Sequence, residues 1–208
     1  MSPDLRAYLT EMPLIAVLRG LPPEHALSVG QILVEAGFRI LEVPLNSPHP
    51  YKSIRTLASA FGGQALIGAG TVIRQEDVAE VANTGGSLIV MPHMDPAVIV
   101  EAEWKMMTCV AGVATPTEAF AALKAGADGL KLFPAQLISP AAVKAMRAVL
   151  PANTILLPVG GITPDKLPDY FAAGADGFGL GSELFKPDYP MEEIRQRAQS
   201  FVAAARRR

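Results

Sequence analysis

The segment Lys124-Ala-Gly-Ala-Asp-Gly-Leu-Lys-Leu-Phe133 shows the unit from which this chain is built. The end of an amphipathic run is followed by a glycine and then by a short apolar run. The same order returns in Ala172-Ala-Gly-Ala-Asp-Gly-Phe-Gly-Leu180 and, more loosely, in Glu35-Ala-Gly-Phe38. A glycine just beyond a helix favours the left-handed conformation that ends it. The pattern therefore predicts a repeated unit of helix, glycine stop and strand.

Short apolar runs with the length of strands recur along the whole chain. They are Leu14–Leu18, Ile40–Val43, Ala65–Ile67, Leu88–Met91, Met107–Val110, Gly129–Phe133, Ile155–Leu157 and Gly177–Leu180. Nearly continuous apolar runs are typical of parallel strands that are covered on both faces. Segments with apolar residues at helical spacing, such as Ala26–Ala36 and Ala119–Ala125, separate them.

Proline and glycine mark where the helices are expected to begin and end. A capping residue precedes a proline, which suits the first helical position, in Ser47-Pro48, Asp95-Pro96, Thr115-Pro116, Ser139-Pro140 and Thr163-Pro164. Helices are expected to stop at Gly37, Gly62, Gly85, Gly126 and Gly174. The 18 Gly and 18 Pro residues are spread along the chain in this way, which argues against disorder.

Strands that alternate with helices predict a parallel sheet with right-handed crossovers. We expect an α/β fold, a (β/α)8 TIM barrel, with residues 1–208 forming a single domain. A doubly wound open sheet is the alternative, but the first turn, Leu18-Arg-Gly-Leu-Pro-Pro23, lacks the glycine-rich nucleotide fingerprint. The 208 residues are few for a barrel, which typically takes about 250. Residues 2–11 are expected to form a short N-terminal helix that covers the barrel floor.

The composition argues against several kinds of partner. With 18 basic and 20 acidic residues and a net charge of −2, the chain lacks the basic excess of nucleic-acid-binding proteins. No apolar run approaches the about 20 residues that span a bilayer, and the first residues lack a signal-peptide pattern, so no membrane partner is expected. The single cysteine, Cys109, fits a reducing, cytoplasmic location. The histidines His25, His49 and His93 lack metal-ligand spacing, and we expect neither metal nor cofactor.

Lys131 and Glu42 interrupt apolar strands and are the principal chemical candidates. Strand alternation places Leu130 and Leu132 toward the helices, so Lys131 faces the barrel interior, and the same reasoning turns Glu42 inward. Burial lowers a lysine pKa and makes the amine a nucleophile toward carbonyl carbon. Lys131 is accordingly a Schiff-base nucleophile, a ligand of a substrate anion, or half of a structural ion pair. Glu42 is then either a general acid/base or the partner in that pair.

Other candidates follow the strand ends, where barrel enzymes place their sites. Arg19 suits a carboxylate or phosphate, or else forms a surface ion pair. Thr71 is a hydrogen-bonding candidate or a helix cap. Gly160-Gly161 and Gly179-Leu-Gly-Ser182 follow the last two strands, where barrels often bind phosphate through backbone amides, although tight turns also use glycine.

Together these motifs resemble the pyruvate-dependent class I aldolases that cleave 2-keto-3-deoxy-6-phospho sugar acids. The likeness runs from Pro13 to Ser182. It is carried by Leu14-Ile-Ala-Val-Leu-Arg-Gly20, Glu42-Val-Pro-Leu-Asn-Ser-Pro48, Gly68-Ala-Gly-Thr-Val72, Gly129-Leu-Lys-Leu-Phe-Pro134, Pro158-Val-Gly-Gly-Ile-Thr163 and Gly179-Leu-Gly-Ser182.

The resemblance implies roles for the matching residues. Lys131 is implied to be the Schiff-base lysine and Glu42 the acid/base, with no cofactor. The implied substrate-binding residues are Arg19, Asn46, Thr71, Pro92, Val159, Gly160, Gly161, Gly181 and Ser182. The implied small-molecule partners are a phosphorylated keto sugar acid, pyruvate and glyceraldehyde 3-phosphate, and the implied assembly is a homotrimer.

Two positions depart from the gluconate-specific branch of that family. The branch reads Glu-Val-Thr-Leu-Arg-Thr, and its arginine holds the pyruvyl carboxylate, whereas this chain has Asn46 in the arginine's place. The branch reads Pro-Thr-Gly-Gly where this chain has Val159 for the threonine. Both changes resemble the galactonate-specific branch, whose substrate is 2-dehydro-3-deoxy-6-phosphogalactonate. Arg19 then becomes the candidate for the carboxylate, with the phosphate as its alternative partner.

Other functions stay open at the level of the sequence. The nearest is an aldolase for the gluconate epimer or for 4-hydroxy-2-oxoglutarate. More distant are a phosphate-binding barrel isomerase that has no covalent lysine, and a catalytically silent barrel that only binds a phosphosugar. The inward pair of Lys131 and Glu42 favours an enzyme over the silent barrel.

Overall fold

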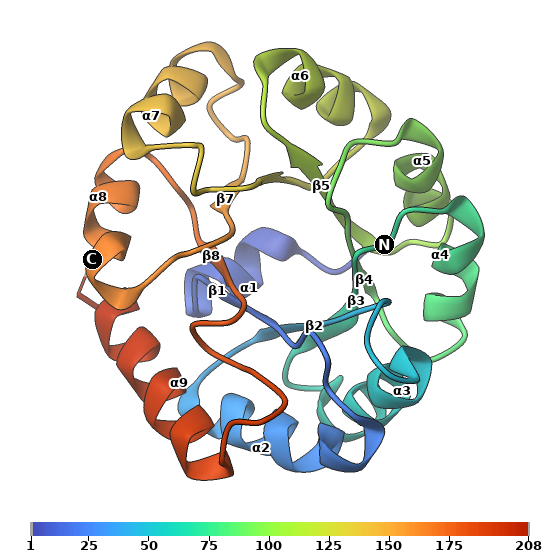
Figure 1. The fold of residues 1–208 in the computed structure, drawn as a ribbon. Helices are drawn as coiled ribbons and strands as arrows, with labels where there is room; N and C mark the ends of the chain where they lie inside the picture. The colour runs from blue at the N-terminus through green and yellow to red at the C-terminus, as the bar shows by residue number, and fades with distance from the viewer. Residues whose placement is uncertain (1, 208) are drawn as a thin grey trace.

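The apolar runs form parallel strands around a barrel in the computed structural model, which describes residues 2–207 (Figure 1). The strands are β1 (Leu14–Val17), β2 (Ile40–Pro44), β3 (Leu66–Gly70), β4 (Leu88–Val90), β5 (Thr108–Val113), β6 (Gly129–Leu132), β7 (Leu156–Pro158) and β8 (Phe178–Leu180). They pair in the order β7-β6-β5-β4-β3-β2-β1-β8, and a parallel bridge from Val159 to Gly179 joins the two ends. The expected TIM barrel is confirmed, and the open sheet is wrong.

Apart from the first, which lies across one end of the barrel, the helices surround the strands, and those between two strands connect them (Figure 1). The helices are α1 (Leu5–Glu11), α2 (Ala26–Ala36), α3 (Pro50–Phe61), α4 (Gln75–Ala82), α5 (Pro96–Trp104), α6 (Pro116–Ala125), α7 (Pro140–Val149), α8 (Leu167–Ala172) and α9 (Met191–Ala205), with short 3-10 helices η1 (Pro23–His25) and η2 (Pro164–Lys166). In the part of the chain that the structure describes, no helix is both long enough and apolar enough to cross a membrane.

Most helix ends follow the predicted signals. Thr115 forms a capping box at the start of α6, where its hydroxyl accepts from the Glu118 amide at 3.3 Å and the Glu118 carboxylate accepts from the Thr115 amide at 2.9 Å. Gly37, Gly126 and Gly174 follow helices with φ of 114°, 103° and 98°, the left-handed region that glycine tolerates.

Two predicted helix ends are wrong, and a third has a different backbone conformation from the one expected. Helix α3 begins at Pro50 and not at Pro48, because a residue that precedes a proline is disfavoured in the right-handed helical region and His49 takes φ 43° instead. Helix α3 ends at Phe61, directly before Gly62 as predicted, but Gly62 has φ −58° and not the expected left-handed conformation. Gly85 is left-handed but lies three residues beyond Ala82, the last residue of α4.

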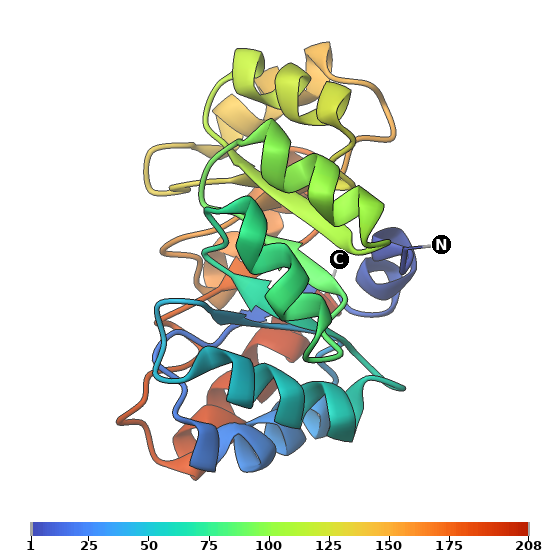
Figure 2. The ribbon, with the colours of Figure 1, turned by 90° about the vertical axis from the view of Figure 1, so that its right-hand side faces the viewer.

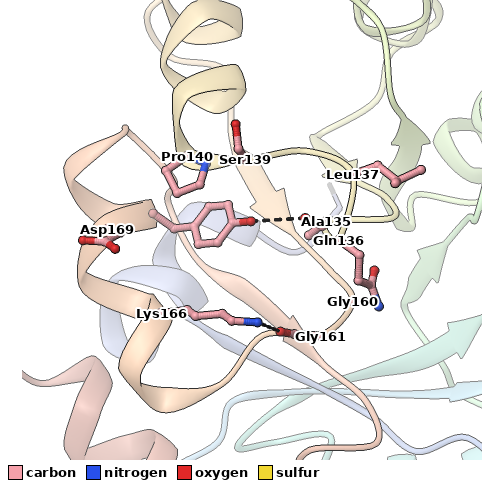
Figure 3. A pocket seen from close by; sticks show the side chains of 10 residues that line it. Ala135, Gln136, Leu137, Ser139, Pro140, Gly160, Gly161, Lys166 and Asp169 are labelled. Atoms are coloured by element: carbon pink, nitrogen blue, oxygen red, sulfur yellow. Dashed lines mark hydrogen bonds between the residues drawn. The ribbon is translucent and has the colours of Figure 1, made fainter.

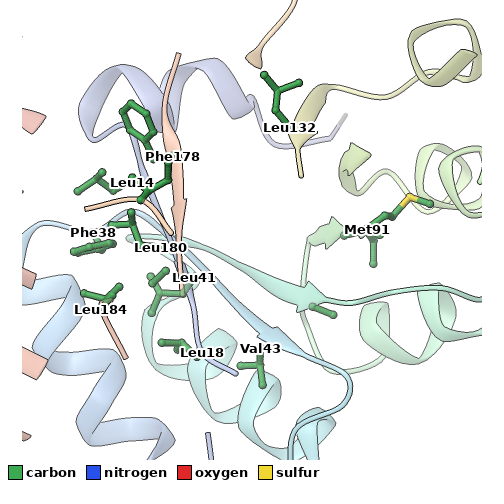
Figure 4. Close-up of a cluster of buried hydrophobic side chains, with 14 of the residues drawn as sticks. Leu14, Leu18, Phe38, Leu41, Val43, Met91, Leu132, Phe178, Leu180 and Leu184 are labelled. Atoms are coloured by element: carbon green, nitrogen blue, oxygen red, sulfur yellow. The ribbon is translucent and has the colours of Figure 1, made fainter. Parts of the chain in front are cut away.

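Apolar side chains form one layer between strands and helices and a second layer inside the barrel. The first includes Leu41 and Val43 of β2 with Phe178 of β8 (Figure 4). In the second, Leu5 and Leu9 of α1 pack with inward side chains from the strand beginnings, namely Ile15, Ile40, Leu66 and Leu88. Helix α1 therefore closes one end of the barrel (Figure 2), as predicted, and leaves the carboxyl ends of the strands open.

Arg147 of α7 ties the last two strands together where the barrel closes. Its guanidinium donates to the carbonyl oxygens of Gly174 and Thr154, each at 2.6 Å, and pairs with Asp176 at 2.6 Å. The Asp176 carboxylate also accepts from the Leu156 amide at 2.9 Å, at the start of β7. These bonds connect the segment before β8 to β7, where an isolated parallel bridge between Val159 and Gly179 takes the place of a regular ladder.

Candidate active site

Glu42 and Lys131 lie inside the barrel on opposite sides of its axis. In the sheet register, Glu42 of β2 is paired with Val17 of β1 and Gly68 of β3. Lys131 of β6 is paired with Gly112 of β5 and Leu157 of β7. Only 1% of Glu42 and 4% of Lys131 is exposed. Both line a narrow cavity whose other walls are apolar or glycine, formed by Ile15, Val17, Val90, Val110, Leu157, Val159 and Gly179. The structure thus places both inward, as strand alternation predicted.

Burial changes the proton affinity of both groups. It raises the pKa of Glu42 to about 7, although the positive charges of Lys131 and Arg19 act in the opposite direction. Burial also lowers the pKa of Lys131, a shift that Glu42 opposes and Arg19 reinforces. Burial thus favours the neutral form of both groups, which suits an amine that attacks carbonyl carbon and a carboxyl group that gives and takes a proton.

The surroundings of Glu42 differ from those of a settled structural ion pair. Its Oε2 is buried and has no hydrogen-bond partner among residues 2–207. A stable buried pair normally has hydrogen bonds to its remaining lone pairs. Glu42 therefore has an oxygen available for a substrate hydroxyl or a water.

Glycine makes room for the carboxylate of Glu42. A Cβ atom on Gly70 of β3 would lie 2.5 Å from Glu42 Oε1 and closer still to Oε2. Gly70 belongs to the Gly68-Ala-Gly-Thr71 motif, but the sequence did not connect it to Glu42 because the contact runs between two strands.

Val159 occupies the corresponding space across the cavity. A Cβ on Gly179 would lie 2.7 Å from Val159 Cγ2, so Gly179 gives the valine its place against the barrel wall. Val159 is buried and lines the same cavity as Lys131. Its two methyl groups are therefore part of the chamber in which a ligand attached to Lys131 would lie.

Phe133 stands over Lys131 at the open end of the barrel. The Lys131 Nζ lies 4.9 Å from the centre of the Phe133 ring, and 36% of Phe133 is exposed. Strand alternation predicted that this side chain faces inward, but nothing in the sequence marked it as a site residue. Its ring shields one side of the amine from water.

Three candidates from successive strand ends meet at the barrel mouth. Arg19, after β1, donates through Nη1 to Asn46 Oδ1 at 2.8 Å and through Nη2 to Thr71 Oγ1 at 3.4 Å. Asn46 follows β2, and Thr71 follows β3 with a left-handed φ of 54°. The sequence named all three residues, but it did not predict that they form one cluster around the guanidinium.

The glycines after β7 form a turn with positive φ angles beside a pocket. Gly160 and Gly161 have φ of 113° and 63°, and Lys166 Nζ donates to the Gly161 carbonyl oxygen at 2.7 Å. A pocket of about 360 Å³ borders this turn on the side of α7 and α8 (Figure 3). Gln136, which the sequence did not single out, lies against both glycines, 2.5 Å from where a Cβ of Gly160 would stand.

The segment after β8 offers a second group of backbone amides. The Gly181 carbonyl oxygen accepts from the amides of Leu184 and Phe185 at 2.9 and 3.0 Å, which folds this segment into a turn. Within residues 2–207, the amides of Gly161 and Ser182 donate no hydrogen bond. No atom lies within 4 Å of a Cβ built on Gly181, so this backbone is open to a ligand.

Pro92 and His93 lie in the segment that follows β4. Pro92 is half-buried after β4, against Gly112 of β5, and His93 beside it is exposed. Among residues 2–207, no three or more His, Cys, Asp and Glu side chains are grouped so as to hold a metal ion. The site is thus built from Lys131, Glu42, the Arg19 cluster and the two glycine turns.

Comparisons with known proteins place this geometry in a family. The family model for KDPG and KHG aldolases matches residues 5–197. A probable 2-dehydro-3-deoxy-6-phosphogalactonate aldolase from Rhizobium meliloti is 48% identical over 93% of this chain and 92% of its own length. The 2-dehydro-3-deoxy-6-phosphogalactonate aldolase of Escherichia coli K12 is 45% identical over 96% of this chain and 97% of its own.

Solved structures agree with the sequence relatives. A native KDPGal structure superposes with a TM-score of 0.93 at 45% identity over 95% of this chain and 96% of that one. A designed cage of fused symmetric oligomeric domains contains a similar chain, with a TM-score of 0.93 and 45% identity over 95% of this chain and 73% of that one. The KDPG aldolase of Legionella pneumophila, captured with pyruvate as a covalent carbinolamine, has a TM-score of 0.82 at 25% identity over 96% and 97% of the two chains. By sequence and by structure, this chain belongs to the KDPG and KHG aldolase family, whose members are carbon–carbon lyases.

Proposed function

We propose that this protein is a class I aldolase that cleaves 2-dehydro-3-deoxy-6-phosphogalactonate into pyruvate and D-glyceraldehyde 3-phosphate. The observation that carries the proposal is the buried Lys131 amine, whose pKa burial lowers, in one cavity with Glu42 inside the barrel. The names of the two galactonate-acting relatives support the choice of substrate.

The first half of the reaction joins substrate to enzyme. The neutral Lys131 amine attacks the C2 keto carbon and forms a carbinolamine. Glu42, protonated at its raised pKa, gives its proton to the C2 hydroxyl, which leaves as water. The product is an iminium ion on Lys131, and Glu42 is left as a carboxylate.

The second half breaks the carbon–carbon bond. The Glu42 carboxylate takes the proton of the C4 hydroxyl, directly or through a water, and the electrons of the C3–C4 bond move into the iminium. Glyceraldehyde 3-phosphate leaves with C4 as its aldehyde carbon, and an enamine remains on Lys131. Glu42 returns the proton to C3, and hydrolysis of the resulting iminium releases pyruvate and the free amine.

Binding groups at the mouth would hold the two ends of the substrate. The Arg19 guanidinium is proposed to hold the C1 carboxylate, with Thr71 beside it. The amides of Gly161 and Ser182, which make no hydrogen bond within residues 2–207, are proposed to hold the phosphate, with Gly160 and Gly181 allowing its close approach. The two ends of the substrate would then fix C2 beside Lys131.

Borohydride trapping tests the covalent step. We expect the intact mass to rise by one reduced pyruvyl group when borohydride is added with pyruvate, and peptide mapping to place the group on Lys131. Lys131→Ala should lose both the adduct and cleavage while it keeps the native circular dichroism spectrum. An unchanged mass in the wild type, or an adduct elsewhere, would refute the Schiff-base mechanism and support the isomerase or silent-barrel alternatives.

The preference for the galactonate epimer rests on Val159. An apolar side chain at this position offers no hydrogen bond to a hydroxyl of the substrate, whereas the gluconate-specific branch has threonine in the corresponding place. Turnover of the two C4 epimers, measured as kcat/KM, decides the substrate. A wild-type preference for the gluconate epimer would assign the protein to that branch instead.

The assembly is proposed to be a homotrimer in the cytoplasm. The similarity to a chain used in a cage of symmetric oligomeric domains supports an oligomer. Light scattering after gel filtration should give three times the mass of the chain, and a monomer or dimer mass would refute the trimer. The cytoplasmic location is supported by the single cysteine, and fractionation of the source cells tests it.

A further inference from the structure

Arg19 is a charged group without a charged partner. Its two side-chain hydrogen bonds go to the amide oxygen of Asn46 and the hydroxyl of Thr71, which are both neutral. Arg19 forms no ion pair within residues 2–207. A guanidinium near acidic side chains usually pairs with one, so an amide as its closest partner calls for a physical reason.

We propose that Asn46 is a positioning residue, which holds the Arg19 guanidinium toward the C1 carboxylate of the bound keto acid while leaving its positive charge uncompensated. This inference rests on the proposed function. It differs from the role of substrate ligand that the resemblance implied for Asn46, because here Asn46 acts through Arg19.

The backbone around the cluster is built to hold this geometry. The Ser47 hydroxyl, adjacent to Asn46, accepts from the Gly20 amide, adjacent to Arg19, at 2.9 Å. The loops after β1 and β2 are therefore connected next to the Arg19–Asn46 hydrogen bond. Thr71 approaches the guanidinium from the loop after β3 in a left-handed conformation. Two N–H groups are engaged by these neutral partners, and the rest of the guanidinium fork stays available.

The charge of Arg19 reaches the reaction centre. The charge of Arg19 shifts the pKa of both reactive groups. It lowers the pKa of Lys131, which Glu42 raises, and it lowers the pKa of Glu42, as Lys131 also does. Leu18, which precedes Arg19, donates its amide to the Glu42 carbonyl oxygen at 2.9 Å, so Arg19 lies beside the reaction centre. The C1 carboxylate is bonded directly to C2. The phosphate lies at the other end of the substrate, on C6. This proximity favours the carboxylate over the phosphate as the anion that Arg19 holds.

An amide at position 46 serves this task better than a carboxylate. A carboxylate would satisfy the guanidinium in the absence of substrate and would have to be displaced by the incoming anion. It would also cancel the positive field that favours the neutral form of Lys131. An amide oxygen orients the guanidinium through the same hydrogen bond without either effect. Asn46→Asp therefore changes charge at nearly constant shape, and Asn46→Ala removes orientation at constant charge.

The test measures borohydride inactivation of the full-length protein against pyruvate concentration and pH. We expect Asn46→Asp to raise the half-saturating pyruvate concentration at least about tenfold. It should also move the midpoint of the curve of inactivation rate against pH upward by roughly half a unit. Asn46→Ala should raise the half-saturating concentration by roughly threefold to tenfold without moving the midpoint. Asn83→Asp, an exposed change of the same kind after α4, is the matched control and should behave as the wild type.

Inorganic phosphate separates the two anions. Inorganic phosphate should inhibit cleavage by the wild type and by Asn46→Asp at the same concentration, because Arg19 holds the C1 carboxylate and not the phosphate end of the substrate. An Asn46→Asp variant that binds pyruvate as the wild type does, or that loses phosphate inhibition instead, overturns the inference. The inference is also overturned if the pH midpoint of inactivation moves as far in Asn46→Ala as in Asn46→Asp. Failure of the wild type to trap pyruvate on Lys131 would be a failure of the proposed function itself.

Discussion

Replacing Gly70 by alanine should disable the acid/base without altering its chemistry. A methyl group on Gly70 would lie 2.5 Å from Glu42 Oε1, whereas ordinary contacts begin at 3.4 Å. Because Glu42 Oε2 would lie closer still to the methyl group, the carboxylate must retreat by more than about 1 Å from its place in the cavity. The backbone of Gly70 is outside the left-handed region, so alanine itself introduces no backbone strain.

The expected loss is large in rate and small in stability. A displacement of about 1 Å in a reacting group costs on the order of 100-fold in kcat. Overpacking a buried site costs about 1–3 kcal/mol of unfolding free energy, which lowers the Tm of a chain of this size by several degrees. We therefore expect Gly70→Ala to be a folded protein with about one hundredth of the wild-type kcat.

Two assays measure this loss. A coupled assay for released pyruvate gives kcat, and deuterium exchange into the methyl group of pyruvate reports Schiff-base formation and proton transfer by Glu42 without cleavage of the carbon–carbon bond. Gly63→Ala is the matched control, because no atom lies within 4 Å of the added methyl group. It should keep both the wild-type kcat and the wild-type Tm.

A double variant identifies the cause. Glu42→Asp shortens the side chain and withdraws the carboxylate from Gly70, so Gly70→Ala should cost little further activity in that background. Additive losses would mean that the methyl group acts through the backbone. A Gly70→Ala protein with kcat within twofold of the wild type would refute the assignment of Glu42, in this position, as the acid/base.

The remaining predictions concern stability and specificity. Because burial raises the pKa of Glu42 from 4.5 to about 7, the stability linked to this group is complete below pH 4.5 and is lost as the pH rises through 7. The free energy of unfolding of Glu42→Gln, relative to that of the wild type, should thus rise between about pH 5 and pH 8, by about 3 kcal/mol at most. Urea denaturation at the two pH values measures this difference, and an equal difference at both would contradict the prediction. Val159→Thr should shift the ratio of the kcat/KM values for the two epimers toward the gluconate epimer by about tenfold. An unchanged ratio would show that Val159 does not determine specificity. Arg147→Leu should lower the free energy of unfolding by about 2 kcal/mol through the partners it leaves at Gly174 and Thr154, and an unchanged Tm would show that these bonds do not stabilise the closure.

Local patterns were sufficient for most of the fold. Apolar runs, capping residues and left-handed glycines depend on neighbours within a few positions, so the strands, most helix ends and the α1 floor could be predicted. The error at Pro48 has the same local origin, because the effect of Pro50 on His49 competes with the cap that Ser47 would form. The predicted position of Gly62 was correct, but its left-handed conformation was wrong because a helix can also end on a residue in the right-handed region.

The sequence by itself determined the barrel, the inward direction of Glu42 and Lys131, and the set of residues that resembles the aldolases. These follow from strand alternation and from motifs of contiguous residues. Only the tertiary structure decided which of these residues meet. The hydrogen bonds of Arg19 to Asn46 and Thr71, and the contact of Gly70 with Glu42, join residues on different strands. The pKa values depend on the same closure, because desolvation and the charge of Arg19 act through space and not along the chain.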